Sequence, residues 1–282
     1  MTKITEGRKR SIIGRSILFP ITRKQLLVKN KKTLILVAVI ILLSLLVING
    51  QKAKRDDQPN VRQHVDFTRF PIVDYAAPAS GDAGARANRA AKGKKYNNKY
   101  APVITESSNG IFVVNESLSG LPALPTDRSS VILIGEVTSA EAHLSEDGTA
   151  IYSEFKVRIQ SVLKNNSKRV LTLDNLVEAE RYGGRLRLPS GKLVISAVDH
   201  QDMPQVGSRY LLFLTNDFPE GGHNDEDFHI LMGYELKAGK VFPLDKTSSK
   251  HPISRYFGSD ESVLLTDLAS ALAAPSPTGM PN

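Results

Sequence analysis

The feature that most constrains this chain is an uncharged apolar run, TLILVAVIILLSLLVING, at residues 33–50. Ser44 is the only polar residue in its interior, whereas an amphipathic helix of a soluble protein carries a polar stripe. A helix of 18 residues is about 27 Å long, which is close to the hydrocarbon thickness of a bilayer. The run therefore predicts a single transmembrane helix. Its residues include Leu34, Ile41, Leu45 and Ile48.

The charges that flank this run predict its orientation. Residues 1–32 contain ten Lys or Arg and one acid, whereas Lys52, Lys54 and Arg55 follow the run. Because cytoplasmic flanks carry the excess of Lys and Arg, we expect a cytoplasmic N-terminus and a C-terminal part that is periplasmic or extracellular. A cleaved signal peptide is the alternative. The 32 residues before the run and the absence of an A-x-A pattern in VINGQKAKR favour an uncleaved signal-anchor.

The net charge of +8 is distributed unevenly along the chain. Residues 1–32 carry +9, residues 51–128 carry +4 from twelve bases and eight acids, and residues 129–282 carry −5 from fifteen bases and twenty acids. An acidic domain repels phosphate, so we do not expect nucleic acid as a partner. The chain has no cysteine, which excludes disulfides, thiolate metal sites and cysteine nucleophiles.

The region between the apolar run and residue 128 has the composition of a linker. Its central part, AAPASGDAGARANRAAKGKKYNNKYAP (76–102), has few apolar groups to offset chain entropy, so we expect disorder there. IFVV (111–114) is a candidate short strand. LPALPTDRSS (121–130) reads as an extended entry segment, because each proline disfavours helix around it.

A β-rich pattern begins at Val131. VILIGEVTSA is a nearly continuous apolar run that is typical of a central strand. IYSEFKVRIQSVL (151–163) alternates, which places Phe155, Val157 and Ile159 on one face. Its other face would carry Glu154, Lys156, Arg158 and Gln160. Further candidate strands, bounded by Gly, Asn, Pro or Asp, are residues 169–173, 184–188, 192–198, 209–215, 228–236 and 240–244.

One helix is predicted after these strands. In SDESVLLTDLASAL (259–272), Ser259 or Asp260 is a suitable N-cap. An apolar stripe follows, made of Leu264, Leu265, Leu268 and Leu272. No strand–helix–strand alternation occurs, so we do not expect a parallel sheet.

These patterns divide the chain into five parts. A basic cytoplasmic tail (1–32) precedes the single transmembrane helix (33–50), and a flexible, disordered linker (51–128) leads to a β-rich extracytoplasmic domain (129–275). Residues 276–282 form a disordered tail. The expected fold class is mainly β, with a small antiparallel β-barrel or sandwich and one C-terminal helix.

The succession VILIGEVTSA, FKVRIQSVLK and GSRYLLFL resembles the netrin-like module, the OB-type barrel that also occurs in tissue inhibitors of metalloproteinases. The resemblance covers residues 129–245 and consists of the strand pattern and a G-x-x-Y-L-L turn into a strand. It implies a barrel fold and a binding role. That module typically carries disulfides, and its inhibitory members use an N-terminal cysteine. This chain has no cysteine, so protease inhibition is not implied.

The stretch RYGGRLRLPSGK (181–192) combines two glycines with alternating arginines. It lacks the spacing of a P-loop, and no helix pattern follows as a dinucleotide-binding turn requires. We interpret it as a hairpin with a Pro-Ser-Gly connection, in which the glycine pair permits a bend. A basic stripe for an anionic ligand would consist of Arg181, Arg185, Arg187 and Lys192. The alternative is pairing of these bases with Glu178 and Glu180.

Metal binding has weak candidates in HNDEDFH (223–229). They are His223, Asp225, Asp227 and His229. Alternating carboxylates suit Ca²⁺, but the glycine and the closing glutamate of an EF-hand loop are missing. No zinc-ligand spacing occurs, and we predict no metal and no cofactor.

No catalytic residue is assigned. Ser153, His143 and Asp147 are close in sequence, but no G-x-S-x-G motif occurs and Ser153 lies within an ordinary strand pattern. We therefore do not expect a serine hydrolase.

These observations lead to one hypothesis and two alternatives. The hypothesis is a single-pass membrane protein that displays a β-rich binding domain outside the cytoplasm, as in a bacterial envelope. Its partners would be the lipid bilayer and a protein or envelope component, and a small-molecule ligand stays open. One alternative is an envelope enzyme, metal-dependent or hydrolytic, that uses His200 or the 223–229 loop. The other is a scaffold subunit of an envelope complex.

Overall fold

The computed structural model describes residues 65–75, 82–98, 101–108, 110–114, 120–216 and 227–274. The predicted transmembrane run and the basic tail before it lie outside these residues, as do His223 and Asp225. Among the described residues, no helix has both the length and the apolar character needed to cross a membrane.

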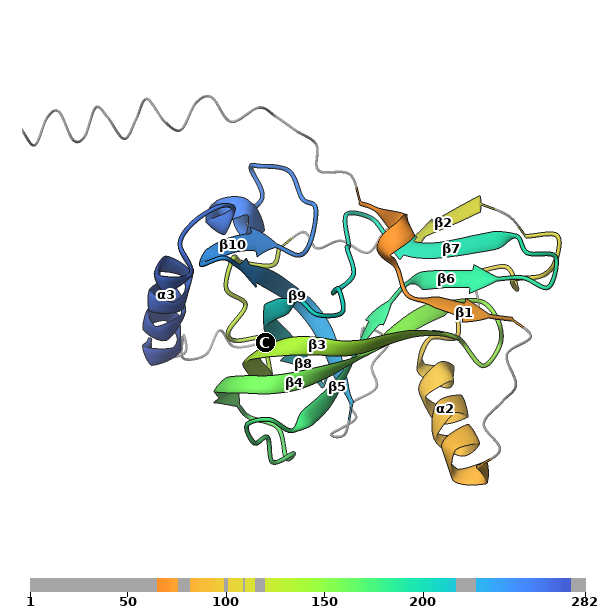
Figure 1. The fold of residues 1–282 in the computed structure, drawn as a ribbon, viewed down its shortest axis with the longest axis horizontal. Coiled ribbons are helices and arrows are strands. Elements are labelled where there is room, and N and C mark those ends of the chain that lie inside the picture. The colour runs from red at the N-terminus through yellow and green to blue at the C-terminus, as the bar shows by residue number, and fades with distance from the viewer. Residues whose placement is uncertain are drawn as a thin grey trace, which may run out of the picture. The chain divides into compact units, whose positions relative to one another are not determined.

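The larger of the two sheets has six strands in the order β10-β9-β5-β4-β3-β8 (Figure 1). Its strands are β3 (Val131–Leu144), β4 (Ile151–Asn165), β5 (Leu176–Tyr182), β8 (Arg209–Thr215), β9 (Phe228–Lys237) and β10 (Lys240–Pro243). Because β8 also pairs with β9, strands β3, β4, β5, β9 and β8 form a closed succession of pairings, here called the five-strand ring. Within it, β5 and β9 are parallel and the other neighbours are antiparallel.

The alternation predicted for residues 151–163 is confirmed in β4. Phe155, Val157 and Ile159 are buried in one apolar core with residues of the other ring strands, whereas Lys156 and Arg158 are exposed. The 14-residue strand β3 pairs with β4 along its length and contains three register shifts. One shift adjoins Gly135, where a Cβ atom would lie 2.5 Å from Val157 Cγ1.

A second apolar core joins the outer side of the ring to helix α3 (Glu261–Ala273) and the 3-10 helix η2 (Pro252–Tyr256). Leu264 and Leu268 of α3 are buried in it, which confirms the predicted helix and its apolar stripe. Asp260 is the N-cap residue, but its side chain makes no capping hydrogen bond. Its carboxylate pairs instead with Lys240 at 2.7 Å.

The smaller sheet has four strands in the order β1-β6-β7-β2. They are β1 (Ile72–Asp74), β6 (Gly184–Arg187), β7 (Leu193–Val198) and β2 (Gly110–Val114). β6 and β7 are antiparallel, but β1 runs parallel to β6 and β2 runs parallel to β7. The sheet is therefore mixed, contrary to the expectation of antiparallel pairing, because its two outer strands come from distant segments of the chain.

The structure also differs from the expectation of a flexible linker up to residue 128. Helix α2 (Ala83–Lys95), the 3-10 helix η1 (Phe67–Arg69), β1 and β2 all lie within that range. Phe70, Tyr96 and Ile104 are buried, with at most 7% of their surface exposed. In Figure 1, α2 (orange) and α3 (blue) lie on different sides of the larger sheet. The fold of the described residues is thus mainly β with two α-helices.

Between β4 and β8, the structure differs from the sequence-based prediction at two places. Residues 169–173 form no strand, and Val170 and Leu173 are 82% and 62% exposed. β5 was not predicted, because its sequence LVEAERY carries three charged residues. Two of them, Glu180 and Arg181, are buried.

Candidate functional site

The β6–β7 hairpin confirms the interpretation of RLRLPSGK as two strands with a short connection. Leu188 N donates to Lys192 O at 2.9 Å, and Gly191 N donates to Leu188 O at 2.8 Å. Gly191 has a φ of +82°, the conformation in which glycine is favoured. No Cβ clash restricts this position, because no atom lies within 4 Å of the site of a Cβ.

The glycine pair is where the chain passes from one sheet to the other. β5 ends at Tyr182 in the larger sheet and β6 begins at Gly184 in the smaller one. Gly183 has a φ of +106°, and a Cβ there would lie 2.7 Å from Met203 Cε and 2.9 Å from Ser196 O. The bend therefore requires glycine both for its backbone angle and for its close contacts.

The four bases of the predicted stripe are not on one surface. Arg185 and Arg187 share a face of β6 opposite the buried Leu186. Arg185 Nε donates to Phe70 O at 2.7 Å, and Arg187 pairs with Asp74 at 3.2 Å. Lys192 is exposed just after the hairpin turn.

Arg181 lies elsewhere, in the interior, with 0% of its surface exposed. It follows Val177 and Ala179 on the inner side of β5, because alternate residues of a strand face the same side. Its Nη2 donates to both carboxylate oxygens of Asp245, at 2.8 and 2.9 Å, and its Nη1 donates to Asp202 O. This buried base is held by protein groups and is not part of a ligand-facing stripe.

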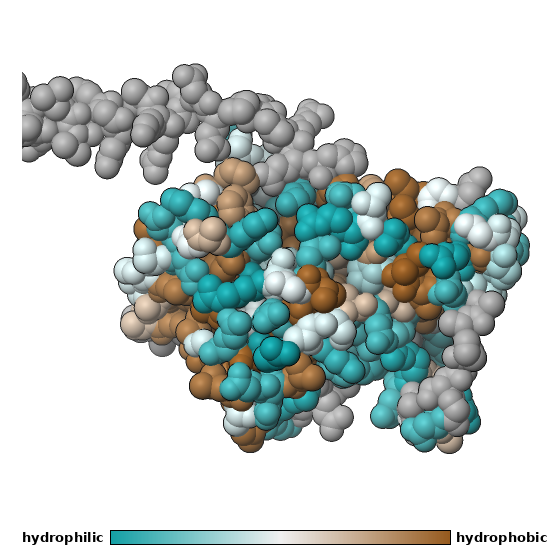
Figure 2. All heavy atoms as spheres, in the orientation of Figure 1, coloured by the Kyte–Doolittle hydropathy of each residue, from teal (hydrophilic) through white to brown (hydrophobic). Residues whose placement is uncertain are grey.

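The face that carries Arg185 and Arg187 also exposes apolar side chains. Ile111 and Val113 of β2 are each 50% exposed, and Leu193 of β7 is 43% exposed. The register pairs Ile111 with Ile195 and Ile195 with Arg185, which places these residues on the same face. We call Ile111, Val113, Leu193, Arg185 and Arg187 the outer sheet face. Figure 2 shows hydrophobic residues (brown) scattered among hydrophilic ones (teal) on the face of the molecule that it draws.

The candidate histidines are not grouped into one site in the described residues. His200 is exposed beside Asp199 at 3.2 Å, whereas His229 is buried. Burial, together with the charge of Arg181, lowers the pKa of His229 to about 4. Over the described ranges, no three His, Asp or Glu side chains are grouped as metal ligands would be.

The Ser153, His143 and Asp147 trio is separated by the strands. Ser153 Oγ donates to Gly183 O at 2.7 Å. His143 lies opposite Tyr152, so it faces the other side of the sheet from Ser153. Asp147 accepts hydrogen bonds from Thr149 within the β3–β4 turn. This arrangement does not form a nucleophile–base pair.

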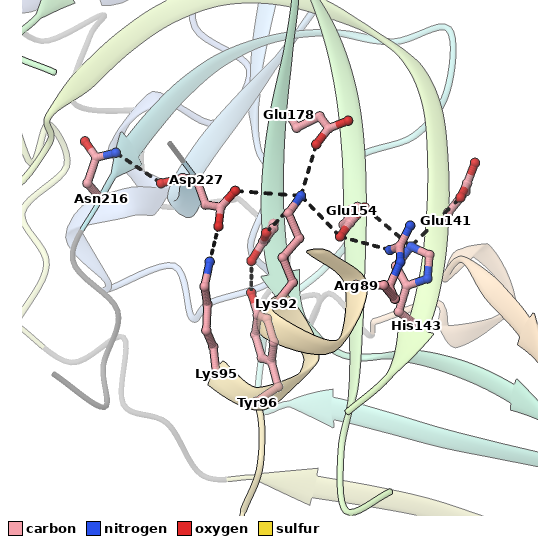
Figure 3. A network of polar contacts seen from close by, with 11 residues as sticks. Arg89, Lys92, Lys95, Tyr96, Glu141, His143, Glu154, Glu178, Asn216 and Asp227 are labelled. Atoms are coloured by element: carbon pink, nitrogen blue, oxygen red, sulfur yellow. Dashed lines mark hydrogen bonds and ion pairs between the residues drawn. The ribbon is translucent and has the colours of Figure 1, made fainter. Parts of the chain in front are cut away.

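A network of charged side chains joins α2 to β4, β5 and the start of β9 (Figure 3). Lys92 lies at its centre. Its Nζ is 3.0 Å from Glu178, 3.5 Å from Glu154 and from Glu180, and 3.7 Å from Asp227. Lys95 pairs with Asp227, and Arg89 pairs with Glu154 at 3.0 Å. The apolar pattern of the sequence does not reveal this site, although the three-residue spacing of the bases places them on one helix face.

The pKa values of two buried or nearly buried carboxylates of this network, Glu180 and Glu154, are shifted in opposite directions. Burial raises the pKa of Glu180 to about 7, although the charges of Lys95 and Lys92 oppose the shift. Burial alone would also raise the pKa of Glu154. A hydrogen bond with His143 and the nearby positive charges instead lower the pKa of Glu154 to about 2. Carboxylates surround Lys92 and raise its pKa above the ordinary value despite burial.

The raised pKa of Glu180 predicts a pH-dependent stability. The folded chain binds the Glu180 proton more tightly than the unfolded chain does, so this stabilisation is complete below about pH 4.5 and is lost as pH rises through about 7. The contribution of Glu180 to the free energy of unfolding that is lost over this pH range amounts to as much as about 3 kcal/mol. We expect Glu180→Gln to flatten the decline in the free energy of unfolding between pH 5 and pH 8, measured by urea unfolding. An unchanged decline in the variant would contradict this assignment.

The groups that face Glu180 come from both sides of the network. Lys92, Lys95 and Tyr96 approach from α2 and the residue after it, and Asp227 approaches from the position just before β9. Tyr96 donates its hydroxyl hydrogen to Glu180 at 2.9 Å. Protonation of Glu180 therefore changes the charge balance at the contact between α2 and the ring.

Compared with models of known protein families, with curated proteins and with solved structures, the chain matches none.

Proposed function

We propose that the chain is a single-pass, membrane-anchored protein that displays a β-rich binding domain outside the cytoplasm. The apolar run at 33–50 and the basic residues before it support the anchor and its orientation. The described residues begin at Val65, soon after that run, and they bury an apolar core without cysteines. Such a domain is held at the membrane surface and acts by binding.

The observation that carries the binding role is the outer sheet face. It combines half-exposed aliphatic side chains on β2 and β7 with the arginines of β6. β2 is the last strand in the order of the smaller sheet, so its second edge is unpaired among the described strands. An unpaired edge beside apolar side chains suits addition of an extended segment from a partner. We propose a protein or envelope component that presents apolar and acidic groups.

The five-strand ring supports the proposal of an OB-type barrel. Five strands that close on themselves are the architecture of that fold, which binds ligands through its strands and loops. This is in keeping with the resemblance to the netrin-like module over residues 129–245. In this chain the smaller sheet adds a surface beside the ring, and we place the binding role there.

Substitution of the apolar part of the outer sheet face tests the binding role. We expect Ile111→Ser combined with Val113→Ser to reduce partner recovery with the full-length protein from solubilised membranes at least tenfold, since contact centres contribute about 2 kcal/mol or more. The free energy of unfolding should fall by about 1 kcal/mol or less, because half of each side chain is already in water.

Val170→Ser combined with Leu173→Ser is the matched control. These side chains are more exposed and lie outside the outer sheet face. Equal loss of recovery in the two double variants would contradict a specific role of β2.

A further inference from the structure

We propose that the outer surface of β4 and β5, with Asp227, is a docking surface for a basic helix, and that α2 is its intramolecular occupant. The surface consists of Tyr152, Glu154, Glu178, Glu180 and Asp227 and is called here the acidic docking face. The partner it fits is a helical segment with bases at the spacing of Arg89, Lys92 and Lys95. Such a partner would compete with α2.

The contacts of α2 show what the acidic docking face recognises. Arg89, Lys92 and Lys95 recur every third residue and so project from one side of the helix. All three pair with carboxylates of the face, and Lys92 alone contacts Glu154, Glu178, Glu180 and Asp227. Figure 3 shows these side chains converging from the helix and from the strands.

An aromatic contact adds to the charged ones. The ring of Tyr96 stacks on the ring of Tyr152 with centroids 4.2 Å apart and planes 4° apart. The Tyr96 hydroxyl donates to Glu180. The acidic docking face therefore accepts an aromatic side chain next to the basic ones.

Helix α2 is not held by an apolar stripe. Its sequence, AGARANRAAKGKK, contains alanine as its only apolar side chain, and residues 86–91 are exposed. An ordinary surface helix is held mainly by its buried apolar side. The bases of α2 differ in exposure, from Arg89 at 43% to Lys95 at 19% and Lys92 at 17%, and ion pairs at exposed positions are weak and depend on salt. Docking of α2 is therefore the kind of contact that a competing basic segment can replace.

The carboxylates also explain why the face needs a cationic occupant. Four acidic groups from β4, β5 and Asp227 lie around one ammonium group. Glu180 is almost fully buried, with 1% of its side chain exposed. Without a base these groups repel one another, and a buried carboxylate without a counter-charge is strongly unfavourable. Release of α2 thus leaves a surface that favours another basic helix.

The test uses a peptide of residues 82–98 as the probe and the full-length protein as the receptor. Lys92→Glu combined with Lys95→Glu in the protein places like charges against the face and should displace its own α2. We expect this variant to bind the fluorescent peptide, measured by anisotropy, at least tenfold more tightly than the unaltered protein does. A peptide with Lys92→Gln and Lys95→Gln is the matched control and should bind neither protein.

Hydrogen exchange supplies the second readout. Amides of residues 83–95 should lose protection in the double variant while those of β3 and β9 keep it. Retained protection of α2, or its release without peptide binding, would overturn the proposal. If β3 and β9 also lose protection, the milder Lys92→Gln variant is measured in the same way. If β3 and β9 also lose protection in the Lys92→Gln variant, α2 is part of the folding core. That result would also overturn the proposal.

Discussion

Replacement of Arg181 by alanine will lower the free energy of unfolding by about 3–5 kcal/mol, the usual cost of removing one partner of a buried ion pair. Arg181 and the Asp245 side chain are both 0% exposed, and the guanidinium binds both carboxylate oxygens. The variant leaves Asp245 without its counter-charge in the interior. Urea unfolding followed by circular dichroism measures the loss.

The exposed pair of Arg187 with Asp74 is the control for this prediction. Both side chains are more than half exposed, so Arg187→Ala should cost less than about 1 kcal/mol. A double replacement, Arg181→Met with Asp245→Leu, should recover part of the stability because it leaves no unpaired charge. Similar losses in the free energy of unfolding for Arg181→Ala and Arg187→Ala would contradict the stabilising role of the buried pair of Arg181 with Asp245.

Substitution of Gly183 by alanine will lower the free energy of unfolding by about 2–5 kcal/mol, from backbone strain and from overpacking together. Its φ of +106° is unfavourable for a residue with a Cβ. A Cβ there would also lie closer than van der Waals contact to Met203 Cε and Ser196 O. The same unfolding measurement reports the loss.

Gly191 separates the two causes. Its φ is also positive, at +82°, but the space around it is open. Gly191→Ala should therefore lose only the cost of a left-handed backbone, about 1–2 kcal/mol. If Gly183→Ala and Gly191→Ala lower the free energy of unfolding by the same amount, the close contacts at Gly183 add nothing to the cost of a Cβ atom there.

The strands with clear apolar patterns were predictable from sequence. The alternation in residues 151–163 and the apolar run from Val131 predict β4 and β3, because one side of each strand must enter the core. The hairpin from 184 to 198 was predictable from its glycine and proline residues. The residues that determine each of these elements lie within the element itself, so the pattern is visible in one sequence.

Two of the elements that the sequence pattern does not reveal, β5 and α2, are held in place by charge. β5 carries Glu180 and Arg181 in buried positions, each neutralised by a residue distant in sequence, Lys92 and Asp245 respectively. Helix α2 reads as a disordered segment because it lacks an apolar stripe. An apolar pattern cannot reveal a contact whose two sides are polar and far apart in the chain.

The outer sheet face was only half predictable. Arg185 and Arg187 alternate with leucine, so their shared face follows from strand geometry. The position of Ile111 and Val113 beside them depends on the parallel pairing of β2 with β7, which joins residues far apart in the sequence. The burial of Arg181 depends likewise on the bend at Gly183 and on a partner at Asp245.

We propose that the outer sheet face is displayed outside the cytoplasm and binds a partner there. Because the chain has no cysteine, Val113→Cys gives the full-length protein a single thiol on this face, and Val170→Cys gives a single thiol elsewhere. Intact cells are treated with a membrane-impermeant maleimide that carries a photoactivatable group. We expect labelling at both positions and a cross-linked product of higher mass from position 113 alone. Absence of labelling at both positions, or equal cross-linking from both, would contradict the proposal.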